Sequence, residues 1–143
     1  MKKYKVGYTA GVFDMFHVGH LNLLRNAKEM CEYLIAGVNS DELVYQYKGK
    51  KAVINEIQRR EIVNSIKYVD RAEIVNTLDK VDAYSKYKFD VIFIGDDWKG
   101  SERWNQTERD LARFGVKVIY LPYTKNLSST QLRGCCQDKI DEL

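Results

Sequence analysis

The sequence predicts an α/β domain with a doubly wound, five-stranded parallel sheet and helices on both faces. Three observations support this fold class. Strand-like and helix-like segments alternate along the chain, which is the order that gives a parallel sheet with right-handed crossovers. The strand-like segments are continuous runs of Ile, Val, Phe and Tyr, as expected for strands covered on both faces. The 143 residues contain one proline and no linker-like stretch, so residues 1–143 are expected to form a single domain.

Short apolar segments are the expected strands. They are rich in β-branched and aromatic residues, and helix-like patterns separate them. In chain order they cover residues 4–9, 33–38, 72–75, 90–95 and 116–121. No G-x-G-x-x-G follows the first of them, which argues against a dinucleotide fingerprint. In such sheets ligands bind at the carboxyl ends of the strands, where the strand order reverses.

Amphipathic patterns predict the first helices. In residues 20–30, Leu21, Leu24 and Ala27 recur at the three- and four-residue spacing of one helix face. A short helix is expected from Asp41, directly after the second strand. Each pattern fills the gap between two strands, as the alternation requires.

Two further helices are predicted over residues 55–69 and 105–115. Asn55 is a suitable N-cap for the first, and Gly115 is a typical stop for the second. One apolar stripe of the first helix is expected to face the core, formed by Ile57, Ile62, Ile66 and Val69.

The composition is that of an ordinary globular protein. The net charge of +3 suits anionic small molecules, but Lys and Arg form no long stripe, so no nucleic-acid partner is expected. The three cysteines, Cys31, Cys135 and Cys136, lack the pattern of a disulfide framework and indicate a reducing compartment. There is no membrane-length apolar run and no signal-peptide core. We therefore expect a cytoplasmic protein without a membrane partner.

Both histidines of the chain, His17 and His20, lie between the first strand and the next helix. Their spacing lets both rings face one way, and Gly19 between them lets a ligand approach closely. Three interpretations are open: helix caps, ligands of a metal ion with Asp14, or donors to a nucleotide phosphate. A helix N-terminus already attracts phosphate, and no other histidine or suitably spaced cysteine is available for a metal. The residues favour the phosphate, and no metal site built by the protein is expected.

The segment "GVFDMFHVGH" (11–20) resembles the signature of the cytidylyltransferases, within the nucleotidyltransferase superfamily built around HxGH. The chain is most similar to the bacterial glycerol-3-phosphate type, whose motifs it carries in the same order and spacing. These are "NSDE" (39–42), "KGKK" (48–51), "RRE" (59–61), "YVD" (68–70), "GDDW" (95–98) and "LPYTKNLSST" (121–130). The resemblance implies a Rossmann-like fold, CTP with Mg²⁺, a small alcohol phosphate as acceptor, and a homodimer.

In the implied reaction an acceptor phosphate oxygen attacks the α-phosphorus of CTP, which gives a CDP-alcohol and pyrophosphate. The nucleophile is already an anion, so catalysis reduces to positioning and charge stabilisation. On this resemblance the catalytic residues are His17, His20, Lys50 and Arg59, and the acceptor-binding residues are Lys48 and Lys80. In an arbitrary chain such a lysine run would be a solvated loop.

The resemblance also places the nucleotide against three segments. Its contacts are expected to be Val12, Phe13, Asp14 and Gly19 in the first, Asp96, Asp97 and Trp98 in the second, and Tyr123, Thr124, Ser128, Ser129 and Thr130 in the third. Asp14 is expected to organise the histidine turn through backbone N–H groups. For the aspartates and hydroxyls, simple helix capping is the alternative.

Some positions depart from the family pattern and leave the acceptor open. Tyr123 stands where arginine is common, and a phenol lacks the charged, bidentate donor. Val12 and Asn126 also differ. Glycerol 3-phosphate is favoured over another polyol phosphate, phosphocholine, phosphoethanolamine or a phosphonate. An ATP-using adenylyltransferase and a nucleotide-sensing or nucleic-acid-binding domain are the other open classes.

Overall fold

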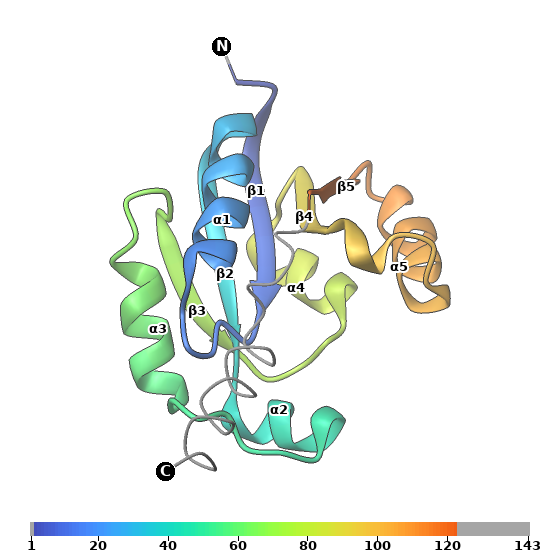
Figure 1. Cartoon of the computed structure of the whole chain (residues 1–143). Helices are drawn as coiled ribbons and strands as arrows, with labels where there is room; N and C mark the ends of the chain where they lie inside the picture. Colours follow the sequence, from blue (N-terminus) through green and yellow to red (C-terminus); the bar gives the residue numbers. More distant parts are fainter. Residues whose placement is uncertain (1, 123–143) are drawn as a thin grey trace, which may run out of the picture.

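The computed structural model describes residues 2–122. Its five strands form one parallel sheet in the order β3-β2-β1-β4-β5 (Figure 1). The strands are β1 (Tyr4–Gly11), β2 (Cys31–Asn39), β3 (Arg71–Val75), β4 (Val91–Gly95) and β5 (Lys117–Leu121). The chain moves outward from β1 to β3 and then returns to place β4 beside β1. This reversal is the switch point of a doubly wound sheet, which confirms the predicted fold class.

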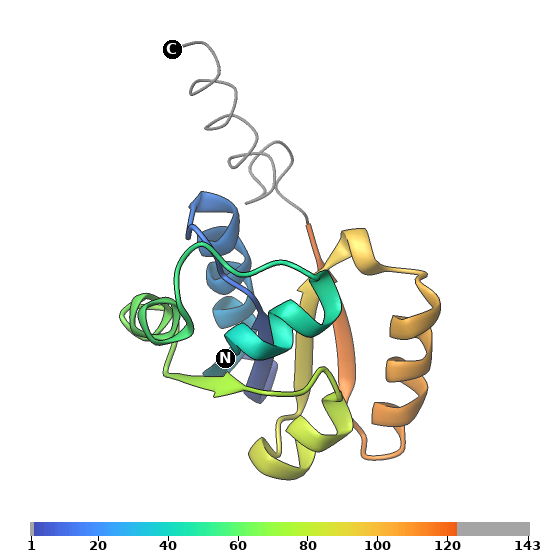
Figure 2. The ribbon, with the colours of Figure 1, turned by 90° about the horizontal axis from the view of Figure 1, so that it is seen from below.

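Helices cover both faces of the sheet. They are α1 (Val18–Met30), α2 (Asp41–Lys48), α3 (Glu56–Asn64), α4 (Lys80–Tyr87), the 3₁₀ turn η1 (Asp96–Trp98) and α5 (Glu102–Ala112). Viewed along the strands, α1 and α3 lie on one side and α4 and α5 on the other, with α2 across the carboxyl ends (Figure 2). Among residues 2–122, no helix has the length and apolar character that a membrane span requires.

Each face of the sheet carries its own buried core. Leu24 of α1 and Val63 of α3 are fully buried in one, and Trp104 and Leu111 of α5 are buried in the other. Burying such side chains contributes about 1.5–3 kcal/mol each. The two cores hold the sheet rigid, so its strand ends can position a site.

Polar side chains begin the helices. Asn55 accepts a hydrogen bond from the backbone N–H of Gln58, which confirms it as the N-cap of α3. Ser101 does the same for α5 with the N–H of Trp104, and this cap starts α5 before the predicted residue 105. Gly115 adopts a φ of 74°, a left-handed conformation that suits the predicted stop.

The predicted apolar face of α3 is wrong in its first half. Ile57 and Ile62 are exposed, whereas Arg59 and Val63 are buried against the sheet. The helix also ends at Asn64, and Ile66 and Val69 pack on the core from the turn that follows. A buried arginine has taken the place that the pattern gave to isoleucine.

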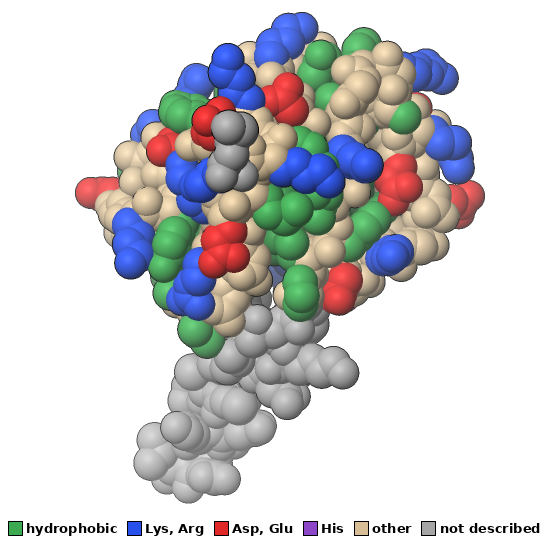
Figure 3. Space-filling view, turned by 90° about the horizontal axis from the view of Figure 1, so that it is seen from above, with side chains coloured by type: hydrophobic (Ala, Val, Ile, Leu, Met, Phe, Trp, Pro, Cys, Tyr) green, Lys and Arg blue, Asp and Glu red, His purple; other side chains and the backbone are tan. Residues whose placement is uncertain are grey.

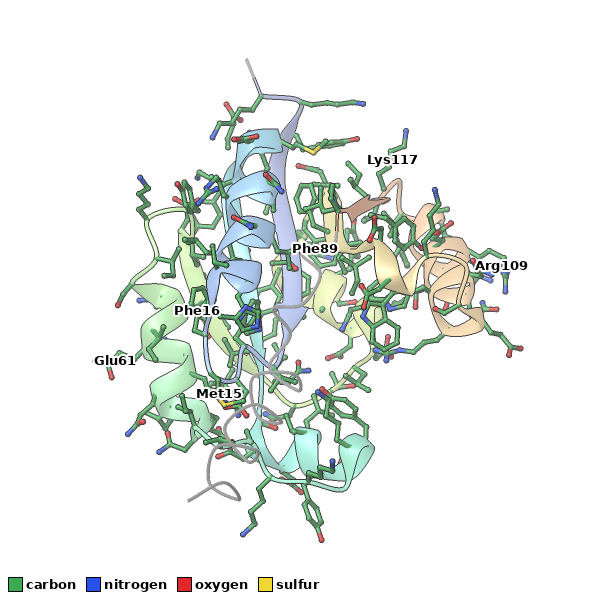
Figure 4. The ribbon with its side chains drawn as sticks, in the orientation of Figure 1. Met15, Phe16, Glu61, Phe89, Arg109 and Lys117 are labelled. Carbon is green, nitrogen blue, oxygen red and sulfur yellow. The ribbon has the colours of Figure 1, made fainter. Side chains whose placement is uncertain are left out.

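The face at the amino ends of the strands carries mixed charges. Lys and Arg side chains there are interspersed with Asp, Glu and apolar groups (Figure 3). Glu61 and Arg109, labelled in Figure 4, project away from the sheet on α3 and α5. Among the described residues, this face shows no stripe of basic side chains (Figure 3).

Candidate active site

A cavity of about 750 Å³ lies at the carboxyl ends of β1 and β4, at the switch point of the sheet. Most of the predicted site residues that the structure describes line it. They are Val12, Phe13, Asp14, His17, Gly19, His20, Lys48, Lys50, Lys80, Asp97 and Trp98. Asp96 and Arg59 are not in its wall. The predicted contacts Tyr123, Thr124, Ser128, Ser129 and Thr130 lie outside the described residues.

The turn between β1 and α1 forms one wall of the cavity. Phe13 and Met15 both have positive φ, at 54° and 48°, which is uncommon for residues other than glycine. Met15 and Phe16 mark this turn in Figure 4, at the end of the sheet where α1 begins. Strained backbone of this kind persists only where the surroundings fix it, and it often occurs at functional sites.

Asp14, between the two strained residues, connects this turn to another segment. Its carboxylate accepts hydrogen bonds from the backbone N–H groups of Val53 at 2.8 Å and Ile54 at 3.0 Å. Backbone N–H groups are the expected partners of Asp14, and the structure confirms two of them, in a segment distant along the chain. Asp14 thereby joins the turn to the segment that follows the lysine-rich loop of residues 48–51.

The two histidines lie at the start of α1, where backbone N–H groups and ring stacking fix both side chains. His17 is the N-cap, and its Nδ1 accepts a hydrogen bond from the N–H of Gly19 at 3.0 Å. The Nδ1 atom of His20 accepts from the N–H of His17 at 3.2 Å. The rings stack with centroids 4.0 Å apart. The capping interpretation is therefore correct for the Nδ1 atoms, and it leaves both Nε2 atoms for another role.

These contacts determine where the imidazole protons lie. Because each Nδ1 acts as an acceptor, a neutral ring carries its hydrogen on Nε2. Burial lowers the pKa of His17, and burial followed by the neighbouring His17 lowers the pKa of His20 to about 4. Both rings are thus neutral near pH 7. The Nε2 atom of His17 is buried and has no hydrogen-bond partner within residues 2–122.

Positive side chains dominate the charged groups of the cavity wall. Lys48, Lys50, Lys51, Lys80 and Arg103 line it, against Asp14 and Asp97. Sequence reasoning missed Lys51 and Arg103. Lys51 belongs to the motif already singled out, but nothing in the pattern of α5 distinguishes Arg103 from its surface charges. The excess of cations suits a cavity for phosphorylated ligands.

Lys80 is the most enclosed of these cations, with an exposed fraction of 7%. Burial, and to a smaller extent the charge of Arg103, lowers the pKa of its ammonium to about 8. It makes no hydrogen bond or ion pair with the part of the chain described here. Burial disfavours the charged form of an ammonium group, so a bound anionic ligand stabilises that form strongly.

Arg59 is buried behind the cavity, which corrects the expectation that it faces the substrates. Its guanidinium donates to the backbone oxygens of Val12 at 2.8 Å, Asn39 at 2.7 Å and Ile54 at 2.7 Å. It also pairs with the carboxylate of Asp41 at 2.6 Å. Arg59 is therefore a positioning residue, which joins the end of β1 to the end of β2.

The segment after β4 forms the opposite wall. Asp97 and Trp98 of η1 line the cavity, and partial burial raises the pKa of the Asp97 carboxyl. The guanidinium of Arg103 lies 5.9 Å from the centre of the Trp98 ring. The structure thus brings two of the three predicted residues of this motif to the site. Within residues 2–122 there is no group of three or more His, Cys, Asp or Glu that could hold a metal ion.

Comparisons with known proteins agree with this geometry. A family model described as cytidylyltransferase-like matches residues 8–134. The chain is 36% identical over 126 residues to the glycerol-3-phosphate cytidylyltransferase of Staphylococcus aureus, covering 87% of this chain and 89% of that protein. It is 38% identical to the protein of the same name from Bacillus spizizenii, covering 87% of this chain and 92% of the relative.

Solved structures show the same fold. The lipopolysaccharide core biosynthesis protein of Thermoplasma volcanium superposes with a TM-score of 0.71 at 26% identity, over 85% of this chain and 98% of that one. Pantothenate synthetase of Thermus thermophilus superposes with a TM-score of 0.63 at 15% identity, over 93% and 66% of the respective chains. At this identity the second likeness concerns the fold alone.

Proposed function

The chain belongs to the cytidylyltransferase-like family, and we propose that it transfers the cytidylyl group of CTP to glycerol 3-phosphate, giving CDP-glycerol and pyrophosphate. The observation that carries this proposal is the cavity itself. Two neutral imidazoles with Nε2–H donors lie in a wall that also carries five cationic side chains. Such a wall suits two anionic substrates that must approach each other.

The chemistry requires little beyond this arrangement. A phosphate oxygen of the acceptor forms a bond to the α-phosphorus of CTP, and the bond from that phosphorus to the β-phosphate bridging oxygen breaks. The electron pair leaves with pyrophosphate, so no strong base is needed. The Nε2–H groups of His17 and His20 donate to phosphate oxygens on which charge builds up. Because Nδ1 bonds already orient the rings, little reorganisation accompanies the reaction.

The cations divide between the two substrates. Lys50 and the start of α1 bind the triphosphate, while Lys48 and Lys80 bind the acceptor phosphate. Asp97 and Trp98 contact the nucleoside part of CTP. Arg59 and Asp14 keep the histidine turn and the lysine-rich loop together.

Mg²⁺ is expected to bind together with CTP. The described residues offer no carboxylate cage for it: Asp14 already accepts two backbone N–H bonds, and Asp97 lies on the other wall. When bound, the ion would be held mainly by triphosphate oxygens, where it would neutralise charge. The active form is a homodimer, as expected for this family, and the enzyme works in the cytoplasm.

The direct test is pyrophosphate release by the purified protein. CTP with glycerol 3-phosphate should give the highest kcat/KM, with CDP-glycerol identified by mass spectrometry. ATP in place of CTP, and phosphocholine or phosphoethanolamine in place of the acceptor, are the comparison arms. Higher turnover with ATP, or with another acceptor, would overturn the proposal.

A further inference from the structure

Asn39, the last residue of β2, carries an unpaired polar atom in the cavity wall. Its side chain lines the cavity and is only 4% exposed. The amide Nδ2–H donates to the hydroxyl of Tyr47 at 3.1 Å, but Oδ1 is buried and accepts no hydrogen bond from residues 2–122. Rotating the amide by 180° would exchange the two atoms, so either orientation leaves one of them unpaired.

An unpaired buried amide atom is costly unless a ligand satisfies it. Such a group has lost its hydrogen bonds to water on burial, and nothing in the folded protein replaces them. Tyr47 also lines the cavity, and its hydroxyl oxygen accepts from Asn39 while its own hydrogen is still available. The pair therefore offers one acceptor and one donor side by side. This is the complement of an alcohol hydroxyl, which both donates and accepts.

The backbone of Asn39 is held firmly enough to fix this pair. Its carbonyl oxygen accepts from Arg59 at 2.7 Å, and the residue pairs with Val75 of β3 within the sheet. A side chain on a strand that is anchored in this way keeps its direction without a ligand. Rigid support of this kind makes a polar contact selective.

The position of the pair indicates which hydroxyl it binds. The ammonium of Lys48 lies 5.8 Å from the centre of the Tyr47 ring, so a phosphate near Lys48 would bring its alcohol part to Tyr47. Asn39 lies on the β2 side of β1, whereas Asp97 and Trp98 follow β4 on the other side of β1. We propose that Asn39 and Tyr47 form a hydroxyl-binding subsite for the alcohol part of the acceptor phosphate, an inference that rests on the proposed function.

The test compares two acceptors that differ only in their hydroxyls, glycerol 3-phosphate and n-propyl phosphate. In the wild-type protein the ratio of their kcat/KM values should be roughly 100 or more, because a site built for a hydroxyl rejects an analogue that lacks it. Asn39→Leu and Tyr47→Phe should each reduce this ratio at least about tenfold, while the KM for CTP changes less than about threefold. Tyr47→Phe removes a single oxygen from a partly exposed residue, so it tests the proposal even if Asn39→Leu folds poorly.

Tyr45→Phe is the matched control, because Tyr45 lies on the same helix, is 57% exposed and is not in the cavity wall. It should leave the acceptor ratio unchanged. A parallel comparison of CTP with 2′-deoxy-CTP separates the acceptor from the ribose as the source of the hydroxyl.

Each other outcome overturns the inference in a recognisable way. If the wild type makes CDP-glycerol but both variants keep the full acceptor ratio, the subsite is absent while the proposed function stands. If the variants lose the preference for CTP over 2′-deoxy-CTP instead, the pair binds the ribose. If the wild type transfers no cytidylyl group at all, the proposed function fails, and this inference fails with it.

Discussion

The backbone N–H of His17 donates a hydrogen bond to Nδ1 of His20 at 3.2 Å, so one histidine's backbone orients the other's ring. The N–H of Gly19 fixes the ring of His17 in the same way. Both rings thus use Nδ1 to begin α1, which leaves the Nε2–H groups of these two cavity-lining residues as their remaining donors. Helix capping and phosphate binding are performed by different atoms of the same side chains. Each role can therefore be tested without removing the other.

The first prediction concerns stability at acidic pH. The pKa of His20 in the folded protein, about 4, lies below the ordinary value of 6.5, so the unfolded chain binds more protons between these values. The contribution of His20 to the free energy of unfolding should be complete above pH 6.5 and should decrease as pH falls toward 4. Urea denaturation of the unliganded protein at several pH values measures this. His20→Asn, which keeps an acceptor near Nδ1, should flatten the dependence; an equally steep curve in the variant would contradict the assignment.

The second prediction concerns Lys80 at alkaline pH. Its pKa of about 8 means that the ammonium loses its proton above pH 8, whereas the acceptor phosphate stays fully ionised there. The KM for glycerol 3-phosphate should therefore rise roughly fivefold from pH 8 to pH 9. In Lys80→Met the KM should be high at both pH values and independent of pH. A wild-type KM that does not change over this range would show that Lys80 does not bind the acceptor.

The third prediction separates Lys48, the last residue of α2, from Lys50 in the loop that follows. Lys50→Ala should raise the KM for CTP, and Lys48→Ala should raise the KM for the acceptor, each by roughly tenfold, as for a hydrogen bond to a charged group. Both effects should shrink as salt is added, since these side chains are exposed and their charges are screened. Lys117→Ala is the control of equal charge, at the far end of β5 (Figure 4). If the KM changes in Lys48→Ala and Lys50→Ala are no larger than those in Lys117→Ala, both lysines are solvated surface residues that bind neither substrate.

The fourth prediction concerns Arg59. Arg59→Lys keeps the charge but cannot reach three carbonyl oxygens and Asp41 together, so the free energy of unfolding should fall by about 1–3 kcal/mol. Well below the melting temperature, kcat should still be at least roughly tenfold lower, because the turn and the end of β2 lose their common anchor. Arg60→Lys, at an exposed neighbouring residue, is the control. A normal kcat in folded Arg59→Lys would show that Arg59 contributes to stability and not to catalysis.

Some of the site is predictable from the sequence because its motifs follow strands directly. His17, His20, Asp97 and Trp98 stand just after β1 or β4, and parallel strands bring their carboxyl ends to one edge. Short continuous apolar runs that alternate with amphipathic helix patterns are typical of strands buried on both faces. The strands, the switch point and these side chains therefore follow from local pattern and topology.

Other features could not be predicted, since they depend on distant partners. Arg59 is buried only because carbonyl oxygens from three separate segments converge on it, and no spacing in α3 indicates this. Arg103 reaches the cavity through the way α5 packs against α4. The bonds of Asp14 to Val53 and Ile54 join segments about forty residues apart. Such contacts are set by tertiary packing, which a single sequence does not display.

The central claim is that the Nε2–H groups of the histidines act on the phosphates while their Nδ1 atoms cap α1. His17→Asn tests it most directly, because the asparagine Oδ1 can accept from the N–H of Gly19 as Nδ1 does, but nothing replaces Nε2–H. We expect the melting temperature of this variant to stay close to that of the wild type, whereas His17→Ala should lose about 1 kcal/mol of stability.

The decisive measurement is kcat for His17→Asn with saturating CTP and glycerol 3-phosphate. The loss of one transition-state donor predicts a kcat at least roughly 100-fold below that of the wild type in a protein of unchanged stability. A kcat near the wild-type value would contradict the account, since His17 would then serve only as the cap of α1.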